Sequence, residues 1–184
     1  MEKERARLLE LLRRRSYEER EVILSSGRRS TFYIDGKQTT LDPEGAYLVG
    51  KVLFQMIKAG GKGVEAVRGP TPGADPMVTA IALVSHLEGA PLPAFIIRKE
   101  PKKHGKGLWI EGDKALRKGM KVAVVEDVVT TGSSLLRAIK VAEEHGLQVV
   151  QLLALVDREE GGRERLAAEG YELEAVFTRS EIKG

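Results

Sequence analysis

The sequence predicts an α/β fold, a doubly wound, mostly parallel sheet flanked by helices. Short apolar runs, typical of strands buried on both faces, alternate along the chain with amphipathic stretches. Strands that alternate with helices are joined by right-handed crossovers and form a largely parallel sheet. Ligands bind such sheets beyond the carboxyl ends of the strands. We therefore expect the loops that follow Val67, Ile97, Val125 and Val156 to converge on one cleft.

The N-terminal part is predicted to hold two helices and a hairpin. Leucines gather on one side of the first helix, with arginine and glutamate elsewhere. A Ser/Gly/Arg stretch joins two short runs typical of strands, which indicates a hairpin. Asp42 as the N-cap and Pro43 as the first helical residue predict the start of the second helix. The predicted elements are a helix at 2–15, strands at 21–24 and 31–35, and a helix at 43–58.

The rest of the chain alternates between strands and helices. Each predicted strand is a short apolar run, and each predicted helix carries apolar residues at helical spacing. The predicted strands are 64–67, 94–97, 122–125, 149–156 and 172–177, and the predicted helices are 77–86, 133–145 and 162–169. A long polar segment, residues 98–113, interrupts the alternation.

The composition is that of an ordinary soluble globular protein, with 42% hydrophobic and 31% charged residues. At 184 residues the chain fits a single domain. It contains no cysteine, which excludes a disulfide framework and a thiolate metal site. A net charge of +3 is too small to argue for nucleic acid. The N-terminus lacks a signal-peptide pattern and no apolar run could span a bilayer, so we expect a cytoplasmic protein without a membrane or nucleic-acid partner.

Residues 121–134 are the stretch around which the chain is organised. The apolar run 122–125 suits a buried strand, and Glu126 and Asp127 follow where that strand is expected to end. The loop 130–134, Thr-Thr-Gly-Ser-Ser, then opens an amphipathic helix. Backbone N–H groups, hydroxyls and a helix N-terminus can together bind an anion. The loop is not a Walker A motif, because it lacks that spacing and its lysine.

The two acids limit which ligands can bind beside the loop. Carboxylates beside a phosphate site repel it, so another group must interact with them. A ribose 5-phosphate fits, because its hydroxyls can donate to Glu126 and Asp127 while its phosphate lies over the loop. The alternative is that the acids only end a strand and that Ser133 or Ser134 only caps a helix. Either feature alone favours that alternative, whereas both in this order favour a ligand site.

This stretch closely resembles the phosphoribosyl-pyrophosphate (PRPP) motif of the type I phosphoribosyltransferases. The shared pattern is four apolar residues, two acids, two more apolar residues and a Thr/Gly/Ser loop. The residues that the resemblance places on PRPP are Glu126, Asp127, Val128, Val129, Thr130, Thr131, Gly132, Ser133 and Ser134.

The basic segment 98–113 has three readings. It is a solvated loop, a nucleic-acid patch in which Trp109 stacks on bases, or a mobile lid that neutralises a pyrophosphate leaving group. It resembles the catalytic loop of the orotate phosphoribosyltransferase family, which runs from Arg-Lys-Glu through a basic stretch to His-Gly. The residues that the resemblance places on PRPP here are Arg98, Lys99, Lys102 and His104.

The same resemblance implies catalytic roles for three of these residues and a shared active site. Lys99, Lys102 and His104 are the implied catalytic side chains, with His104 either an acid for the leaving group or an electrostatic contact. In that family the loop reaches into the neighbouring subunit, which implies a homodimer whose lid, 98–113, serves the partner's site. The family usually has an acid where this chain has Lys106.

Three further segments match the family by position. Residues 68–75 are either a plain turn or the pyrophosphate loop, in which many relatives carry a lysine where this chain has Gly73. The Asp-Arg-Glu-Glu-Gly-Gly stretch places Arg158 where the family binds the orotate carboxylate, a group that a guanidinium binds bidentately. Residues 26–35 resemble the hood that covers the base, and we expect a single domain in which 1–41 form the N-terminal helix and hood and 42–184 the PRPP-binding core. The residues implied for orotate are Thr130, Arg158, Phe32 and Tyr33, and Ser25 replaces a common lysine.

The resemblance covers nearly the whole chain and implies transfer of phosphoribose from PRPP to orotate, within UMP biosynthesis. It also implies Mg2+, held mainly through PRPP and without an assigned protein ligand. The core packing of Phe32 and Tyr33 is an equal alternative to contact with the base. Two other functions are considered, a phosphoribosyltransferase for a purine base and a non-enzymatic PRPP-sensing regulator.

Overall fold

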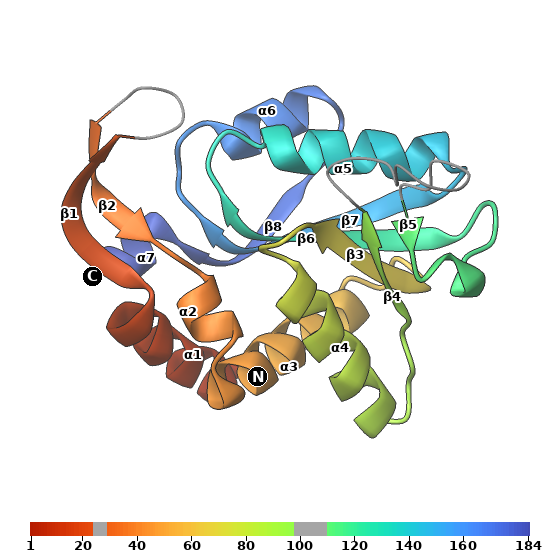
Figure 1. Cartoon of the computed structure of the whole chain (residues 1–184), viewed down its shortest axis with the longest axis horizontal. Helices are drawn as coiled ribbons and strands as arrows, with labels where there is room; N and C mark the ends of the chain where they lie inside the picture. The colour runs from red at the N-terminus through yellow and green to blue at the C-terminus, as the bar shows by residue number, and fades with distance from the viewer. Residues whose placement is uncertain (24–28, 98–109) are drawn as a thin grey trace.

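The computed structural model describes residues 1–23, 29–97 and 110–184, in which a six-stranded sheet lies between two layers of helices (Figure 1). Across the sheet the strands are β5 (Ile110–Glu111), β4 (Ala94–Ile97), β3 (Ala66–Pro70), β6 (Lys121–Val129), β7 (Gln148–Asp157) and β8 (Leu173–Thr178). All neighbouring pairs are parallel except β4 with β5. The predicted fold class, a mostly parallel α/β sheet flanked by helices, is confirmed.

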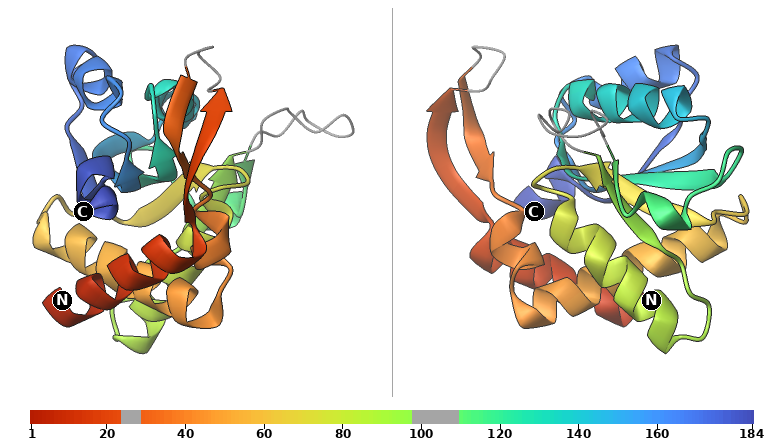
Figure 2. Two further views of the ribbon diagram at one scale, coloured as in Figure 1. Left: turned by 90° about the vertical axis from the view of Figure 1, so that its left-hand side faces the viewer. Right: turned by 45° about the vertical axis from the view of Figure 1, so that its right-hand side comes forward.

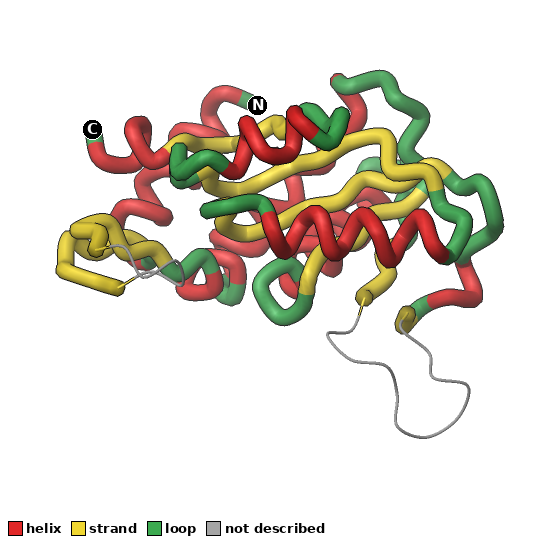
Figure 3. Tube along the Cα trace, turned by 90° about the horizontal axis from the view of Figure 1, so that it is seen from above, coloured by secondary structure: helices red, strands yellow, loops and turns green. Residues whose placement is uncertain are grey.

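Alternation along β6 explains how the sheet buries both faces. Ala123 and Val125 pack into one core together with α1 (Glu2–Arg15), α3 (Pro43–Ala59) and α4 (Asp75–Leu87). Val124 packs into another core beneath α5 (Ser133–Glu144) and α6 (Gly162–Ala168). Figure 3 shows the molecule from above, with the helices running roughly along the strands. All four residues of the apolar run 122–125 are fully buried.

A separate hairpin, β1 (Tyr17–Ile23) and β2 (Arg29–Ile34), projects beside the sheet (Figure 2). Its first strand begins at Tyr17 instead of residue 21. The reason is the pairing of Tyr17 with Ile34 and the packing of the Tyr17 ring against Phe32, 5.0 Å between centroids. The hairpin that the sequence predicts is therefore present, with a longer first strand.

Helix α3 begins as predicted, because the Asp42 side chain accepts a hydrogen bond from the Gly45 N–H at 3.0 Å. Four short elements were not predicted. They are α2 (Lys37–Thr40), β5, a 3-10 helix (Asp113–Ala115) and α7 (Arg179–Lys183). Each is five residues or shorter, too short for a periodic pattern to appear in the sequence.

Strand β6 is longer than predicted, and this corrects the position of the two acids. Glu126 and Asp127 lie within the strand, which continues to Val129. The cause is β7, a ten-residue strand whose pairing continues past Glu126, opposite Ala154, to Val129, opposite Asp157. The carboxyl end of β6 is therefore the start of the Thr/Gly/Ser loop itself.

Within the described residues, no helix is both long and apolar enough to cross a membrane.

Candidate active site

The loop 130–134 encloses a cavity of about 230 Å3 between the end of β6 and the start of α5. Gly132 is the N-cap of α5, with a φ of 74°, a left-handed conformation that suits glycine. It offers no side chain to cap the helix, so the N–H groups of the first turn are left for another acceptor. The lining residues are Glu126, Val128, Val129, Thr130, Thr131, Gly132, Ser133 and Ser134. These eight were all predicted as site residues, and the structure brings them together.

A cation that the sequence analysis missed lies beside this loop. Arg165 of α6 donates from Nη1 to the Ser133 hydroxyl at 2.7 Å, and the Thr131 hydroxyl lies 3.0 Å from that of Ser133. The start of α6 packs directly on the loop, because a Cβ at Gly162 would come within 2.8 Å of the Thr130 carbonyl oxygen. Thirty residues separate Arg165 from the loop, and no sequence pattern joins them.

Glu126 lies under the loop and is nearly fully buried. Burial raises the pKa of its carboxyl to about 9, and the neighbouring Asp127 raises it further, whereas Arg68 lowers it. Burial also raises the pKa of Asp127, against the hydrogen bond from the Val128 N–H (2.9 Å) and the charge of Lys37. A buried carboxyl group beside a half-buried one forms a site that favours hydrogen-bond donors from a ligand.

Asp127 meets the loop that follows β3. A Cβ at Gly73 would lie 2.4 Å from Asp127 Oδ1, and one at Gly36 would lie 3.3 Å from Asp127 Cβ. The carboxylate therefore fits against a backbone without side chains at these two positions. This contact explains why Gly73, and not a larger residue, follows the cis peptide bond between Thr71 and Pro72. It also brings α2 to the site, since Lys37 follows Gly36.

The loop after β7 completes the cluster. The Arg158 N–H donates to the Val129 carbonyl at 2.9 Å, and its Nη2 donates to the Phe32 carbonyl at 2.9 Å. Its guanidinium also pairs with Glu160 at 3.0 Å and is 8% exposed, as is the Glu160 side chain. Arg158 thus lies just beyond a strand end, as the sequence predicts, and it ties the hairpin to the sheet.

Phe32 is fully buried. Its ring has no exposed surface, and the guanidinium groups of Arg158 and Arg179 each lie 5.5 Å from the ring centroid. This burial agrees with core packing, the alternative that the sequence left open for Phe32, and contact of this residue with a base stays a prediction. Tyr33 is half-buried, and the Arg20 guanidinium lies 3.9 Å from its ring centroid.

Three of the four expected loops therefore meet at one edge of the sheet: those after β3, β6 and β7. The fourth follows β4, and the predicted residues Arg98, Lys99, Lys102 and His104 lie outside the described residues. Ile97 pairs with Ile110, so the two described residues that flank 98–109 lie side by side in the sheet. Residues 110 and 111, predicted as part of the lid, belong to β5 instead, because Ile110 is buried in the core.

Across residues 1–23, 29–97 and 110–184, no group of three acidic or histidine side chains could hold a metal ion by itself. Mg2+ is commonly held by one or two carboxylates together with the phosphates of a substrate. Glu126 and Asp127, beside a loop that suits phosphate, fit an ion held mainly by the substrate.

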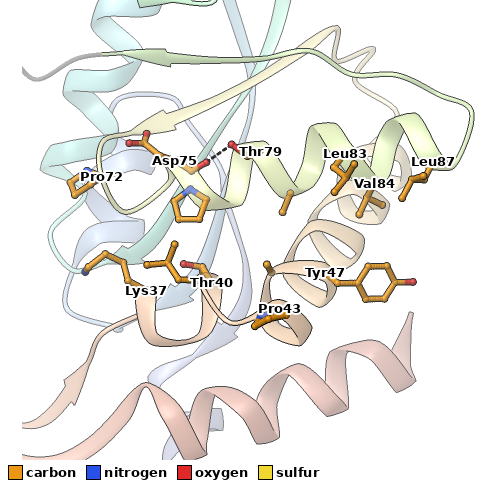
Figure 4. Close-up of a pocket in the computed structure, with 14 residues that line it drawn as sticks. Lys37, Thr40, Pro43, Tyr47, Pro72, Asp75, Thr79, Leu83, Val84 and Leu87 are labelled. Atoms are coloured by element: carbon orange, nitrogen blue, oxygen red, sulfur yellow. Dashed lines mark hydrogen bonds between the residues drawn. The ribbon is translucent and has the colours of Figure 1, made fainter.

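A second hollow, of about 710 Å3, lies between α4 and the start of α3 (Figure 4). Lys37 and Pro72 lie at one end of it, and Tyr47 and Leu87 lie at the other. Its large apolar side chains are open to solvent: Leu41 is 69% exposed, Tyr47 50%, Leu83 60% and Leu87 70%. Contiguous exposed apolar surface of this kind marks an interaction site.

Comparison with known proteins gives one consistent result. The model of the phosphoribosyl transferase domain matches residues 38–176. The chain is 48% identical over 182 residues to the orotate phosphoribosyltransferase of Aquifex aeolicus, covering 97% of both chains. It is 47% identical over 179 residues to that of Sorangium cellulosum, covering 97% of this chain and 93% of the relative. The crystal structure of Mycobacterium tuberculosis orotate phosphoribosyltransferase in complex with PRPP superposes with a TM-score of 0.80 at 35% identity, covering 98% and 99% of the two chains.

Proposed function

The chain belongs to the phosphoribosyltransferase family, and on that premise we propose that it is an orotate phosphoribosyltransferase. It transfers the 5-phosphoribosyl group of PRPP to orotate and gives orotidine 5-monophosphate and pyrophosphate, a step in UMP biosynthesis. The observation that carries the proposal is the uncapped α5 N-terminus and its hydroxyl loop, placed directly against the buried carboxyl group of Glu126, with the half-buried Asp127 next to it. A phosphate and a sugar hydroxyl are the two kinds of group that these elements bind.

Different site residues bind different parts of PRPP. The loop 130–134 and the first turn of α5 hold the 5-phosphate, with Arg165 adding a positive charge at Ser133. Glu126 and Asp127 accept hydrogen bonds from the ribose hydroxyls. The loop 71–74, held against Asp127 through Gly73, lies where the pyrophosphate leaves.

In the reaction a nitrogen of orotate bonds to the anomeric carbon as the bond to pyrophosphate breaks. Pyrophosphate takes the electron pair, and the proton that the nitrogen loses passes to pyrophosphate or to solvent. The chain has no cysteine, and the reaction needs no covalent enzyme intermediate. Catalysis follows from orientation of the two substrates and stabilisation of charge on the leaving group, roles in which we place Lys99, Lys102 and His104. Mg2+, when bound with PRPP, supplies positive charge to the pyrophosphate.

The direct test measures PRPP-dependent consumption of orotate, with adenine, hypoxanthine and uracil as competing substrates. We expect consumption of orotate alone. Consumption of a purine base would establish the first alternative function, and binding of PRPP without any turnover would establish the regulator. The names of the relatives favour orotate over both.

Arg158→Ala is expected to raise the KM for orotate at least tenfold and the KM for PRPP much less. A guanidinium–carboxylate pair in a largely buried site is strong, and Glu160 already shows that this guanidinium holds a carboxylate. The matched control is Arg179→Ala, because Arg179 lies at the same distance from the Phe32 ring but follows β8 instead of β7. Equal changes in both KM values for Arg158→Ala, matching those of the control, would show a structural arginine.

Gly73→Ala is expected to weaken PRPP binding about tenfold or more, with little change in melting temperature. The new methyl group displaces the Asp127 carboxylate, which lies 2.4 Å from its position. Titration calorimetry with PRPP measures the effect. In an Asp127→Ala background, where those oxygen atoms are gone, Gly73→Ala should add nothing; an additive loss there contradicts the mechanism.

The apolar hollow between α3 and α4 supports a homodimer, and we assign a second copy of this chain as its occupant. The hollow ends at Lys37 and Pro72, which adjoin Gly36 and Gly73 and therefore Asp127. A subunit docked on this face lies next to the reaction centre, where the resemblance places the partner's lid. The division into 1–41 and 42–184 and a cytoplasmic location stay proposals of the same kind.

A further inference from the structure

The turn that follows β7 contains a residue in an unusual backbone conformation. Among the residues that the structure describes, Glu159 is the only one other than glycine with a positive φ, 56°. A glutamate in this left-handed region is uncommon, and the conformation persists only where neighbouring contacts hold it. Glu159 comes directly after Arg158, so the contacts that hold Glu159 also determine how the turn presents Arg158.

Asp157 holds the turn from the side of the sheet. It is the last residue of β7, is 2% exposed and lies opposite Thr178 of β8. Its Oδ1 accepts a hydrogen bond from the Glu159 N–H at 2.9 Å, and its Oδ2 accepts one from Arg163 Nε at 3.1 Å. Arg163 also donates from Nη1 to the Leu173 carbonyl at 2.6 Å. The carboxylate is therefore fixed at both oxygen atoms, and its local bond to the backbone N–H two residues later stabilises the turn.

The helix α7 holds the turn from the other side. Oε2 of Glu159 accepts hydrogen bonds from both the N–H (2.9 Å) and the hydroxyl (2.6 Å) of Ser180. Ser180 lies in the first turn of α7, where N–H groups have no acceptor within the helix. Thr178 and Glu181 form a capping box around the same turn, so α7 offers Glu159 a fixed pair of donors. The left-handed residue is thus held through both its backbone and its side chain.

Arg158 lies between these two anchored residues. Its N–H donates to the Val129 carbonyl at 2.9 Å, so the main chain is also held on the side of β6. Its side chain is 8% exposed, just beyond the carboxyl end of β7. A bidentate contact with a carboxylate requires a fixed orientation of the guanidinium plane, which a mobile turn would lose. The contacts of Asp157 and Glu159 therefore benefit a ligand of Arg158, although neither residue needs to touch that ligand.

We propose that Asp157 and Glu159 are positioning residues for orotate, which act by holding the turn that presents the Arg158 guanidinium. The proposal rests on the proposed function, because it takes orotate as the ligand of Arg158. Through Ser180 it also gives α7 a part in the binding of orotate. The contacts of the Glu159 side chain run to α7, whereas the loop 130–134 lies between β6 and α5 with α6 packed on it, so the binding of PRPP should change less.

The test compares the KM values of variants in steady-state kinetics. Glu159→Ala removes the contact with Ser180 at an exposed position, and we expect the KM for orotate to rise about three- to tenfold while the KM for PRPP changes less than about twofold. Glu159→Gln keeps an acceptor oxygen and should restore the KM for orotate. Asp157→Ala should act in the same direction, and the Glu159 variants decide the test if it does not fold. Glu164→Ala, which removes an exposed negative charge from α6, is the matched control and should change neither KM.

An Arg158→Ala background separates positioning from a structural role. In that background Glu159→Ala should add nothing to the KM for orotate, because the guanidinium that it positions is gone. Equal rises in both KM values, an unchanged KM for orotate, or a further rise in the Arg158→Ala background would overturn the proposal. Failure of the wild type to use orotate, or a KM for orotate that Arg158→Ala leaves unchanged, would instead refute the proposed function at this arginine.

Discussion

Asp127→Asn is expected to fold normally and to lose most of its affinity for PRPP. Losing a charge-assisted hydrogen bond costs about 1.5–3 kcal/mol, or roughly a ten- to 150-fold rise in Kd. Asparagine has the shape of aspartate, so the contacts with Gly36 and Gly73 are preserved. Titration calorimetry with PRPP measures the change, and turnover should fall with it.

The stability of this variant should not decrease. The pKa of Asp127 is raised in the folded protein, mainly by burial, so its charged form is disfavoured by folding at neutral pH. A neutral amide removes that penalty, and the melting temperature should stay the same or rise. Glu172→Gln removes one exposed negative charge and is the matched control, with unchanged affinity. Wild-type PRPP affinity in Asp127→Asn would refute the role of this acid.

Much of the fold was predictable because long helices and strands repeat a hydrophobic pattern along their length. Helix α1 has the predicted bounds, and β4 does too, because periodic leucines and a bounded apolar run are local features. The extent of β6 was not predictable in this way. Its last residues, including Glu126 and Asp127, are polar or follow polar residues, and only their pairing with β7 makes them strand. Tertiary contacts decided where the sequence pattern ended.

In the candidate site, too, the contiguous features were predictable and the contacts between distant residues were not. The loop 130–134 was predictable because its residue types and order are contiguous. The fit of Asp127 against Gly73, the approach of Arg165 to Ser133 and the burial of Phe32 join residues far apart in sequence. Such contacts depend on how β3, β6 and α6 are arranged in the fold, and a single sequence carries no signal for that arrangement.

A mixture of two inactive variants is expected to regain activity. Lys102→Ala should lose turnover through the lid, and Asp127→Asn should lose it through the ribose site. If each lid serves the neighbouring subunit, a heterodimer has one site with both defects and one site with neither. Random exchange of subunits in an equal mixture should then restore about a quarter of the wild-type activity, since half of the dimers are mixed and each has one intact site.

The surface between α3 and α4 supplies the control. Leu83→Glu with Leu87→Glu places two charges on the exposed apolar face of α4, which a second copy would bury. With these changes in both partners, sedimentation should show monomers, and mixing should restore nothing.

The outcome separates the two possible arrangements of the lid. If the lid serves its own subunit, every site in the mixture keeps one defect, and activity stays low although subunits exchange. Exchange is followed independently, with a tag on one variant, so that low activity cannot result from a failure of the subunits to exchange. If activity still recovers in the Leu83→Glu, Leu87→Glu background, the dimer contact lies elsewhere. If recovery is lost in that background, the apolar face forms the dimer contact that brings the partner's lid to Asp127.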